Sequence, residues 1–172
     1  MYTFICEWIQ TFRWRILSLF PVPVERVPYL VIIALVVIAL GLALLVIAAL
    51  SFVVPTGYNN STPRLMKSAE QLDQYPFLFR LQSAHNNSLE FLAMLLPSFW
   101  AASELAMPPH LFAKLSVLAL LARLLYVLAY ALNEDLLRTW SFFVAISALL
   151  DVGFGAVFPE SLERYGAYNL AA

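Results

Sequence analysis

Hydrophobic residues are most concentrated in one uninterrupted segment near the start of the chain. No charged residue occurs between Val27 and Pro63, and residues 29–54 form a continuous apolar run that includes a single serine, Ser51. About 20 apolar residues are enough for a helix to cross the hydrocarbon core of a bilayer. The pattern therefore predicts a membrane-spanning helix over 29–54, whose side chains face lipid on most sides.

Three further apolar segments are long enough to span a bilayer, but each contains ionisable residues. Typical helix stops separate these segments: Pro108-Pro109 lies between the second and third spans, and Asn133-Glu134-Asp135 lies between the third and fourth. We expect Asp135 to cap the last helix or to complement its dipole. Short connections between four spans predict an all-α antiparallel bundle with both termini on one side of the membrane. The three expected spans cover residues 75–103, 111–132 and 139–158.

The first 25 residues form a separate segment with a different pattern. Apolar residues recur there at helical spacing from Ile5 to Leu19, polar residues lie opposite them, and Pro21 and Pro23 follow. This pattern predicts an amphipathic helix in the membrane interface over 1–25. The alternatives are a cleaved signal peptide and a surface for docking another membrane protein. The four-helix domain would then cover 26–158, and 159–172 would be a C-terminal tail.

Polar residues within the second and third spans follow the same spacing. At offsets 0, 3, 7 and 10, the side chains fall within an arc of about 80° on each helix. Charged side chains inside a membrane are expected to face the bundle interior and to pair with one another. Two facing stripes would form a polar cleft. The residues are Arg80, Ser83, Asn87 and Glu90 on the second span, and Arg123, Tyr126, Tyr130 and Asn133 on the third.

Residue counts from the ends of the spans place these side chains at two depths. A shallow group would hold Arg80, Tyr126, Tyr130 and Arg138 near one membrane face. A deeper group would hold Asn87 together with an ion-pair cluster of Arg123, Glu90 and Asp151. A structural salt bridge that ties the helices together and a role in chemistry are both open for Glu90 and Arg123. His85 falls opposite the polar stripe, so we expect it to face another helix or another subunit.

The composition confirms a membrane location and excludes several functions. The 172 residues are 62% hydrophobic and only 12% charged, whereas a soluble domain is about half apolar and a quarter charged. A net charge of −1 offers no basic field for nucleic acid, and one cysteine with two histidines forms no metal-binding motif. Lysines and arginines divide almost evenly between the two membrane sides, so the orientation stays open. Nucleophile and phosphate-loop motifs are absent from the sequence, which suggests that any reactive group arrives on a bound molecule.

Two stretches resemble the MAPEG family, membrane-associated proteins of eicosanoid and glutathione metabolism. They read RLQSAHNNSLEF from Arg80 and LARLLYVLAYALNEDLLRT from Leu121. The matching features are an arginine, an A-H-x-N-x-x-E core, then R-x-x-Y-x-x-x-Y and an arginine after the loop. The strong match covers about 60 residues. The helical layout extends the resemblance to about 29–158.

The resemblance implies a homotrimer of four-helix subunits that binds glutathione between neighbouring subunits. Arg80, Asn87 and Glu90 would contact or organise the glutathione site, and Tyr126 and Tyr130 would contact the peptide. The resemblance also gives roles to two further arginines: Arg123 would support the wall of the site, and Arg138 would stabilise the thiolate. A lipophilic substrate would enter from the membrane lipids.

The resemblance leaves three functional hypotheses. A glutathione-dependent transferase or peroxidase acting on lipophilic electrophiles or lipid hydroperoxides is the leading one. The second is a non-catalytic lipid-binding or accessory subunit of a larger membrane complex, which contacts its partners through residues 1–25. It is favoured by Ser83, which stands where many members have a second arginine. The third is an ion or proton carrier that uses Glu90, Arg123 and Asp151.

Overall fold

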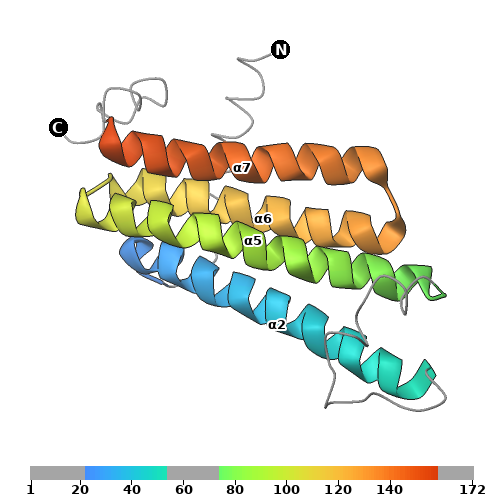
Figure 1. The fold of residues 1–172 in the computed structure, drawn as a ribbon. Coiled ribbons are helices and arrows are strands. Elements are labelled where there is room, and N and C mark those ends of the chain that lie inside the picture. Colours follow the sequence, from blue (N-terminus) through green and yellow to red (C-terminus); the bar gives the residue numbers. More distant parts are fainter. Residues whose placement is uncertain (1–21, 54–73, 159–172) are drawn as a thin grey trace.

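The computed structural model describes residues 22–53 and 74–158 of the chain. In these ranges a 3₁₀ turn, η1 (Val24–Arg26), leads into four long helices that run side by side in alternating directions (Figure 1). The predicted all-α four-helix architecture is confirmed. The helices are α2 (Val27–Val53), α5 (Pro76–Glu104), α6 (Pro109–Leu132) and α7 (Asp135–Val157). The tail over 159–172 and most of the N-terminal helix predicted for 1–25 lie outside the described residues.

Local sequence signals explain where the helices begin and end. Pro76 and Pro109 are the first residues of α5 and α6, a position where the missing amide hydrogen of proline costs nothing. Asn133 ends α6 in a left-handed conformation with φ of 62°. Helix α7 begins at Asp135, four residues before the expected start at 139, and Asp135 supplies the acidic group of its first turn.

Two clusters of buried hydrophobic residues hold the helices together. The larger cluster joins all four helices and includes Phe99 of α5 and Phe112 of α6, whose rings meet edge to face with centroids 5.0 Å apart. The smaller one packs α2 against the start of α5, where Val46 and Leu50 meet Leu81. The bundle interior is therefore largely apolar.

Helices α5 and α7 pack closely at one position. A Cβ atom built on Gly153 of α7 would lie 3.3 Å from the Ser98 hydroxyl oxygen of α5. Gly41 of α2, in contrast, has nothing within 4 Å of the same position. The lack of a side chain at Gly153 thus permits a close helix contact.

The outward faces of the bundle are those of a membrane protein. Large hydrophobic side chains such as Val37, Leu44 and Phe143 are exposed along the helices. Helices α2, α6 and α7 are each long and apolar enough to cross a membrane. Trp100 near the end of α5 and Trp140 near the start of α7 are exposed at opposite ends of the bundle, where interfacial tryptophans are expected.

Helix α5 is the most polar of the four helices. Its 29 residues would span about 43 Å, which is more than a bilayer core requires. Most of its polar residues lie in its first half, and they include both buried and exposed side chains. The functional site is built around this half of α5.

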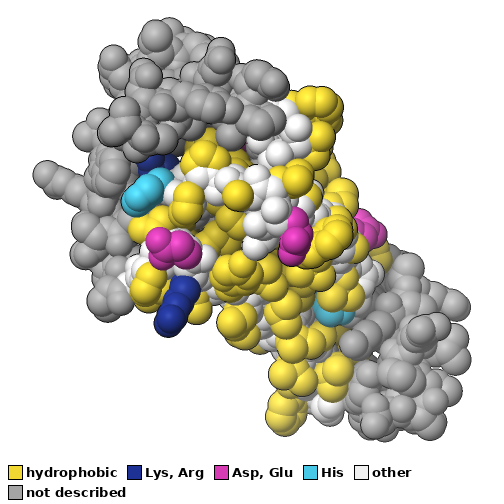
Figure 2. All heavy atoms as spheres, turned by 90° about the vertical axis from the view of Figure 1, so that its left-hand side faces the viewer, with side chains coloured by type: hydrophobic (Ala, Val, Ile, Leu, Met, Phe, Trp, Pro, Cys, Tyr) yellow, Lys and Arg dark blue, Asp and Glu magenta, His cyan; other side chains and the backbone are white. Residues whose placement is uncertain are grey.

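At the end of the bundle that holds the α5–α6 connection, the described residues form no charged surface of a single sign. Figure 2 looks onto this end and shows acidic and basic side chains standing apart among hydrophobic ones. Glu25, Arg26, Glu104 and His110 are exposed among the described residues there. The positively charged site residues described below lie at the opposite end.

Candidate functional site

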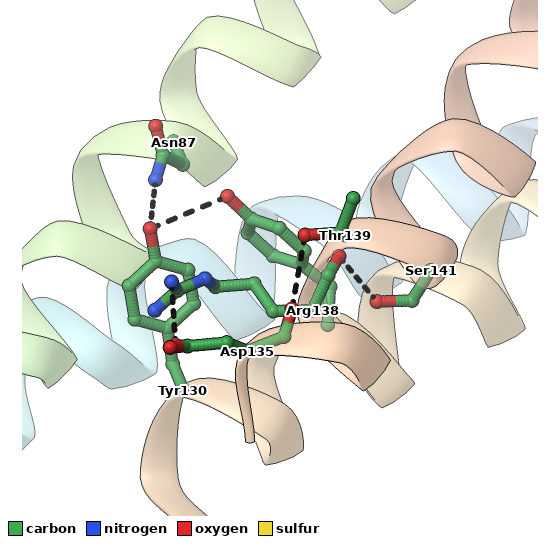
Figure 3. Close-up of polar contacts among 7 residues, drawn as sticks. Asn87, Tyr130, Asp135, Arg138, Thr139 and Ser141 are labelled. Atoms are coloured by element: carbon green, nitrogen blue, oxygen red, sulfur yellow. Dashed lines mark hydrogen bonds and ion pairs between the residues drawn. The ribbon is translucent and has the colours of Figure 1, made fainter. Parts of the chain in front are cut away.

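Three helices meet at a hydrogen-bonded pair of polar side chains. The Asn87 amide nitrogen of α5 donates to the Tyr130 hydroxyl oxygen of α6 over 2.8 Å (Figure 3). Tyr126, one turn earlier on α6, places its hydroxyl 3.5 Å from that of Tyr130, and the two rings meet edge to face. The matching offsets found in the sequence thus bring an amide and two phenols together.

Arg138 of α7 lies against the other side of this group. Its guanidinium carbon is 4.8 Å from the centroid of the Tyr130 ring, within the range of a cation–π contact. Its Nη2 is 2.7 Å from a carboxylate oxygen of Asp135, and the two residues sit one turn apart on α7 (Figure 3). A half-exposed cation is therefore held beside the phenol that Asn87 contacts.

Arg123 lies deeper in the bundle and is almost completely buried, with 2% of its surface exposed. Its guanidinium is stacked between the rings of Phe91 and Tyr126, at 4.7 and 4.2 Å from their centroids. Its Nη2 lies 3.4 Å from the Ser88 hydroxyl, and its Nε has no hydrogen-bond partner in the described part of the chain. Arg123 is thus buried, as expected, and contacts Tyr126, while its role in supporting the wall of the site stays a prediction.

The other charged residues of the predicted site lie around this group. Arg80 is half-buried near the start of α5, with its guanidinium 5.9 Å from the Phe77 ring centroid. Glu90 is exposed on α5, and Asp151 is half-buried on α7. The ion-pair cluster of Arg123, Glu90 and Asp151 stays a prediction.

The exposure of Glu90 differs from the expectation that the whole α5 stripe faces the interior. The buried face of α5 is centred on Leu81, Ser88 and Leu95, which places Glu90 beyond the edge of the core. Ser83 is half-buried and donates to the backbone oxygen of Phe79 in its own helix, at 3.0 Å. The stripe thus runs along the border between the core and the exposed surface.

His85 faces another helix, as expected. Its Nδ1 lies 2.9 Å from the backbone oxygen of Ala39 in α2. Because a carbonyl only accepts hydrogen bonds, this nitrogen carries the proton. The histidine therefore ties α5 to α2 and lies apart from the tyrosine group.

Sequence reasoning missed two contacts of the site. Asp135 was assigned only to the helix start, although its spacing of three from Arg138 is that of neighbours on a helix surface. Phe142 was not singled out, yet its ring lies 6.2 Å from that of Tyr126. Phe142 follows Arg138 by one helical turn, and this spacing could have placed it beside the site.

The arrangement offers a cation, a phenol pair and an amide where three helices meet. Such groups bind anions and polar backbone groups, and a cation also favours the deprotonated form of a nearby thiol. Among the described residues, no group of three histidine, cysteine or acidic side chains is placed to hold a metal. The site is thus suited to recognising a small polar molecule at the membrane surface.

The chain matches the model of the MAPEG family over residues 27–158 and belongs to this family. The match covers all four described helices and the residues of the site. The family assignment and the membrane-spanning helices together make this protein an integral membrane protein of the multi-pass type. Glutathione is involved in the family in general. No curated protein matches the chain.

Proposed function

We propose that this protein is a glutathione-dependent transferase or peroxidase that acts on lipophilic electrophiles or lipid hydroperoxides. The observation that carries the proposal is the position of Arg138 over Tyr130, which in turn accepts a hydrogen bond from Asn87. Three helices thereby contribute to one polar site inside a membrane protein, where each polar group has a cost that a function must justify.

The side chains of this site suit glutathione by charge and by hydrogen bonding. Glutathione carries two carboxylates, one ammonium group and a thiol. Arg80 and Arg138 would bind its anionic groups, Glu90 would bind the ammonium, and Asn87 and the tyrosines would bind the peptide. Arg80 fits such a role because its Nε is buried and has no hydrogen-bond partner among the described residues.

Arg138 would act on the thiol. A guanidinium beside a thiol lowers its pKa and raises the fraction present as the reactive thiolate. Glutathione supplies the nucleophilic sulfur when it is bound. The residues of the chain orient it, and Arg138 would hold the negative charge on that sulfur.

The second substrate would approach through the bilayer. Phe142 lies one turn after Arg138, is partly exposed, and contacts Tyr126 on one side and Phe143 on the other. This aromatic surface leads from the lipid-facing side of α7 to the site. A lipophilic electrophile dissolved in the membrane would meet the thiolate there.

A homotrimer would cover the polar residues that one subunit leaves exposed. Gln82, Asn86 and Glu90 are spaced four apart on α5, and we call them the α5 polar row. Gln82 donates to Asn86 over 2.9 Å, and both Asn86 and Glu90 are exposed. Exposure of such side chains to lipid is costly, whereas contact with a neighbouring subunit satisfies them. This exposure supports a glutathione site completed by a neighbouring subunit.

Conjugation of glutathione to 1-chloro-2,4-dinitrobenzene by the detergent-solubilised full-length protein tests the enzyme proposal. Replacement of Arg138 by alanine should lower the rate on the order of 10²-fold, the scale of losing one stabilising group. Arg26→Ala, at the opposite end of the bundle, is the matched control and should leave the rate unchanged. Absence of both conjugation and glutathione-dependent reduction of a lipid hydroperoxide by the wild type refutes the catalytic proposal.

A non-catalytic accessory subunit is the second candidate, and Ser83 favours it. Ser83 is uncharged, and its hydroxyl donates to a backbone oxygen of its own helix. This position, where many family members have an arginine, therefore offers no positive charge to a ligand. Such a protein would co-purify in fixed stoichiometry with other membrane proteins that cross-link to residues 1–25. A homotrimer that migrates alone and conjugates glutathione excludes this candidate.

A further inference from the structure

Asp135 and Arg138 form an ion pair at the edge of the site that neither the fold nor the glutathione proposal requires. Asp135 is the first residue of α7, with 76% of its side chain exposed, and Arg138 follows one turn later with 30% exposed. A carboxylate in the first turn of a helix interacts favourably with the helix dipole. The negative charge is therefore fixed 2.7 Å from the guanidinium nitrogen.

The pair also determines where the guanidinium lies. One edge of Arg138 is held by Asp135, while its carbon lies over the Tyr130 ring. An unpaired arginine side chain samples many rotamers, and each of them would place the charge elsewhere. The carboxylate thus restricts the cation to the side of α7 that faces α6.

The carboxylate has a second, electrostatic effect. Any anion that approaches Arg138 meets a guanidinium whose charge is partly offset by Asp135. The other titratable groups against Arg138 are Tyr130 and Tyr126 on α6. On α5 the nearest group of the site is the uncharged Asn87, with Arg80 and Glu90 on the same helix. Asp135 is therefore the one carboxylate in an ion pair with this cation among the described residues.

We propose that Asp135 is a positioning residue that aims Arg138 at Tyr130 and moderates the positive charge available to an anionic ligand. The inference rests on the proposed function, because the ligand considered is the thiolate of bound glutathione. As a consequence, Asp135 and Arg138 together set the fraction of bound glutathione that is present as thiolate.

Two substitutions separate the two effects. Asp135→Asn keeps a side-chain oxygen that accepts from Arg138 but removes the negative charge. Asp135→Ala removes both. Glu134→Gln is the matched control, because it removes one charge from the adjacent exposed residue, and Glu134 has no side-chain cap bond. All three variants are studied as full-length protein in detergent.

The first readout is the pH dependence of thiolate formation, followed by ultraviolet absorbance in the presence of glutathione. Exposed ion pairs are worth little, so Asp135→Asn should raise the thiolate fraction by about two- to fivefold below the midpoint, which moves the midpoint to lower pH. Asp135→Ala should in addition have a lower kcat for glutathione conjugation than Asp135→Asn, because it also loses the acceptor that positions Arg138. A midpoint for Asp135→Asn equal to that of Glu134→Gln overturns the electrostatic effect, and equal kcat values for the two Asp135 variants overturn the positioning effect.

The second readout does not depend on glutathione. Phenylglyoxal modifies arginine side chains, and mass spectrometry reports the rate at Arg138 alone. Asp135→Ala should accelerate this modification about two- to fivefold over the wild type, whereas Glu134→Gln should not. Unchanged rates at Arg138 overturn the pairing itself. A wild type that forms no thiolate refutes the proposed function and with it the effect on a ligand, while the modification rates still decide whether Asp135 holds Arg138.

Discussion

The Asn87 amide donates to the Tyr130 hydroxyl over 2.8 Å, and this bond joins α5 to α6 at the level of Arg138. Replacement of Tyr130 by phenylalanine keeps the ring beneath the guanidinium but leaves the amide without its acceptor. We expect the free energy of unfolding to fall by about 1 kcal/mol, since a half-buried donor loses its partner.

A double-mutant cycle of Asn87→Ala and Tyr130→Phe isolates this bond. The double variant should lose less stability than the sum of the two single variants, because each single change already breaks the same contact. Reversible unfolding in mixed micelles provides the measurement. Strictly additive losses would show that the two side chains act independently.

Arg123 is held by stacking between two rings rather than by its charge alone. Arg123→Lys keeps the charge but loses the flat guanidinium, so we expect thermal stability to fall by the equivalent of about 2 kcal/mol or more. Arg26→Lys, at an exposed position of η1, should stay within about 0.5 kcal/mol of the wild type. Equal melting temperatures for the two variants would contradict a stacking role.

The close contact between α5 and α7 makes Gly153 of α7 different from Gly41 of α2. Alanine at Gly41 meets open space and should gain about 1 kcal/mol from helix propensity. Alanine at Gly153 meets the Ser98 hydroxyl at 3.3 Å, so it should gain less or lose stability. Combining Gly153→Ala with Ser98→Ala should restore the gain. Melting temperatures report these changes. Equal shifts for Gly41→Ala and Gly153→Ala would contradict the prediction.

The α5 polar row predicts how the oligomer responds to substitution. Asn86→Leu turns an exposed amide into a side chain that lipid solvates well and removes the partner of Gln82. We therefore expect the proposed trimer of this variant to dissociate at a higher protein concentration than that of the wild type. Met94→Leu, an exposed apolar exchange on the same helix, is the control. Light scattering coupled to size-exclusion chromatography reports the mass, and a monomeric wild type would contradict the trimer.

Sequence patterns predicted the four helices well because bilayer physics leaves few alternatives. The apolar run at 29–54 and the stops at Pro108-Pro109 and Asn133 correspond to α2 and to the ends of α5 and α6. The equal offsets predicted that the polar stripes of the second and third spans face each other. The residue counts, however, placed Asn87 deeper than Tyr130, whereas the two side chains lie at the same level and are hydrogen-bonded. The sequence therefore encodes both where each helix begins and ends and which side chains share a face of it.

What the sequence left open depends on neighbours that the sequence does not specify. A helical pattern gives the relative direction of side chains, but the core of α5 is centred on Ser88, which leaves Glu90 exposed. The partner of His85 is a backbone oxygen of Ala39, and backbone acceptors leave no trace in sequence. The pairing of Asp135 with Arg138 was within reach, because residues three apart on a helix are neighbours.

The most direct test of the central proposal is a calorimetric titration of glutathione into the full-length protein near neutral pH. The proposal predicts saturable binding by the wild type, clearly weakened binding by Arg138→Ala, and wild-type affinity for Arg26→Ala. Absence of binding by the wild type, or equal affinity for Arg138→Ala, would contradict a glutathione site built on Arg138, Tyr130 and Asn87.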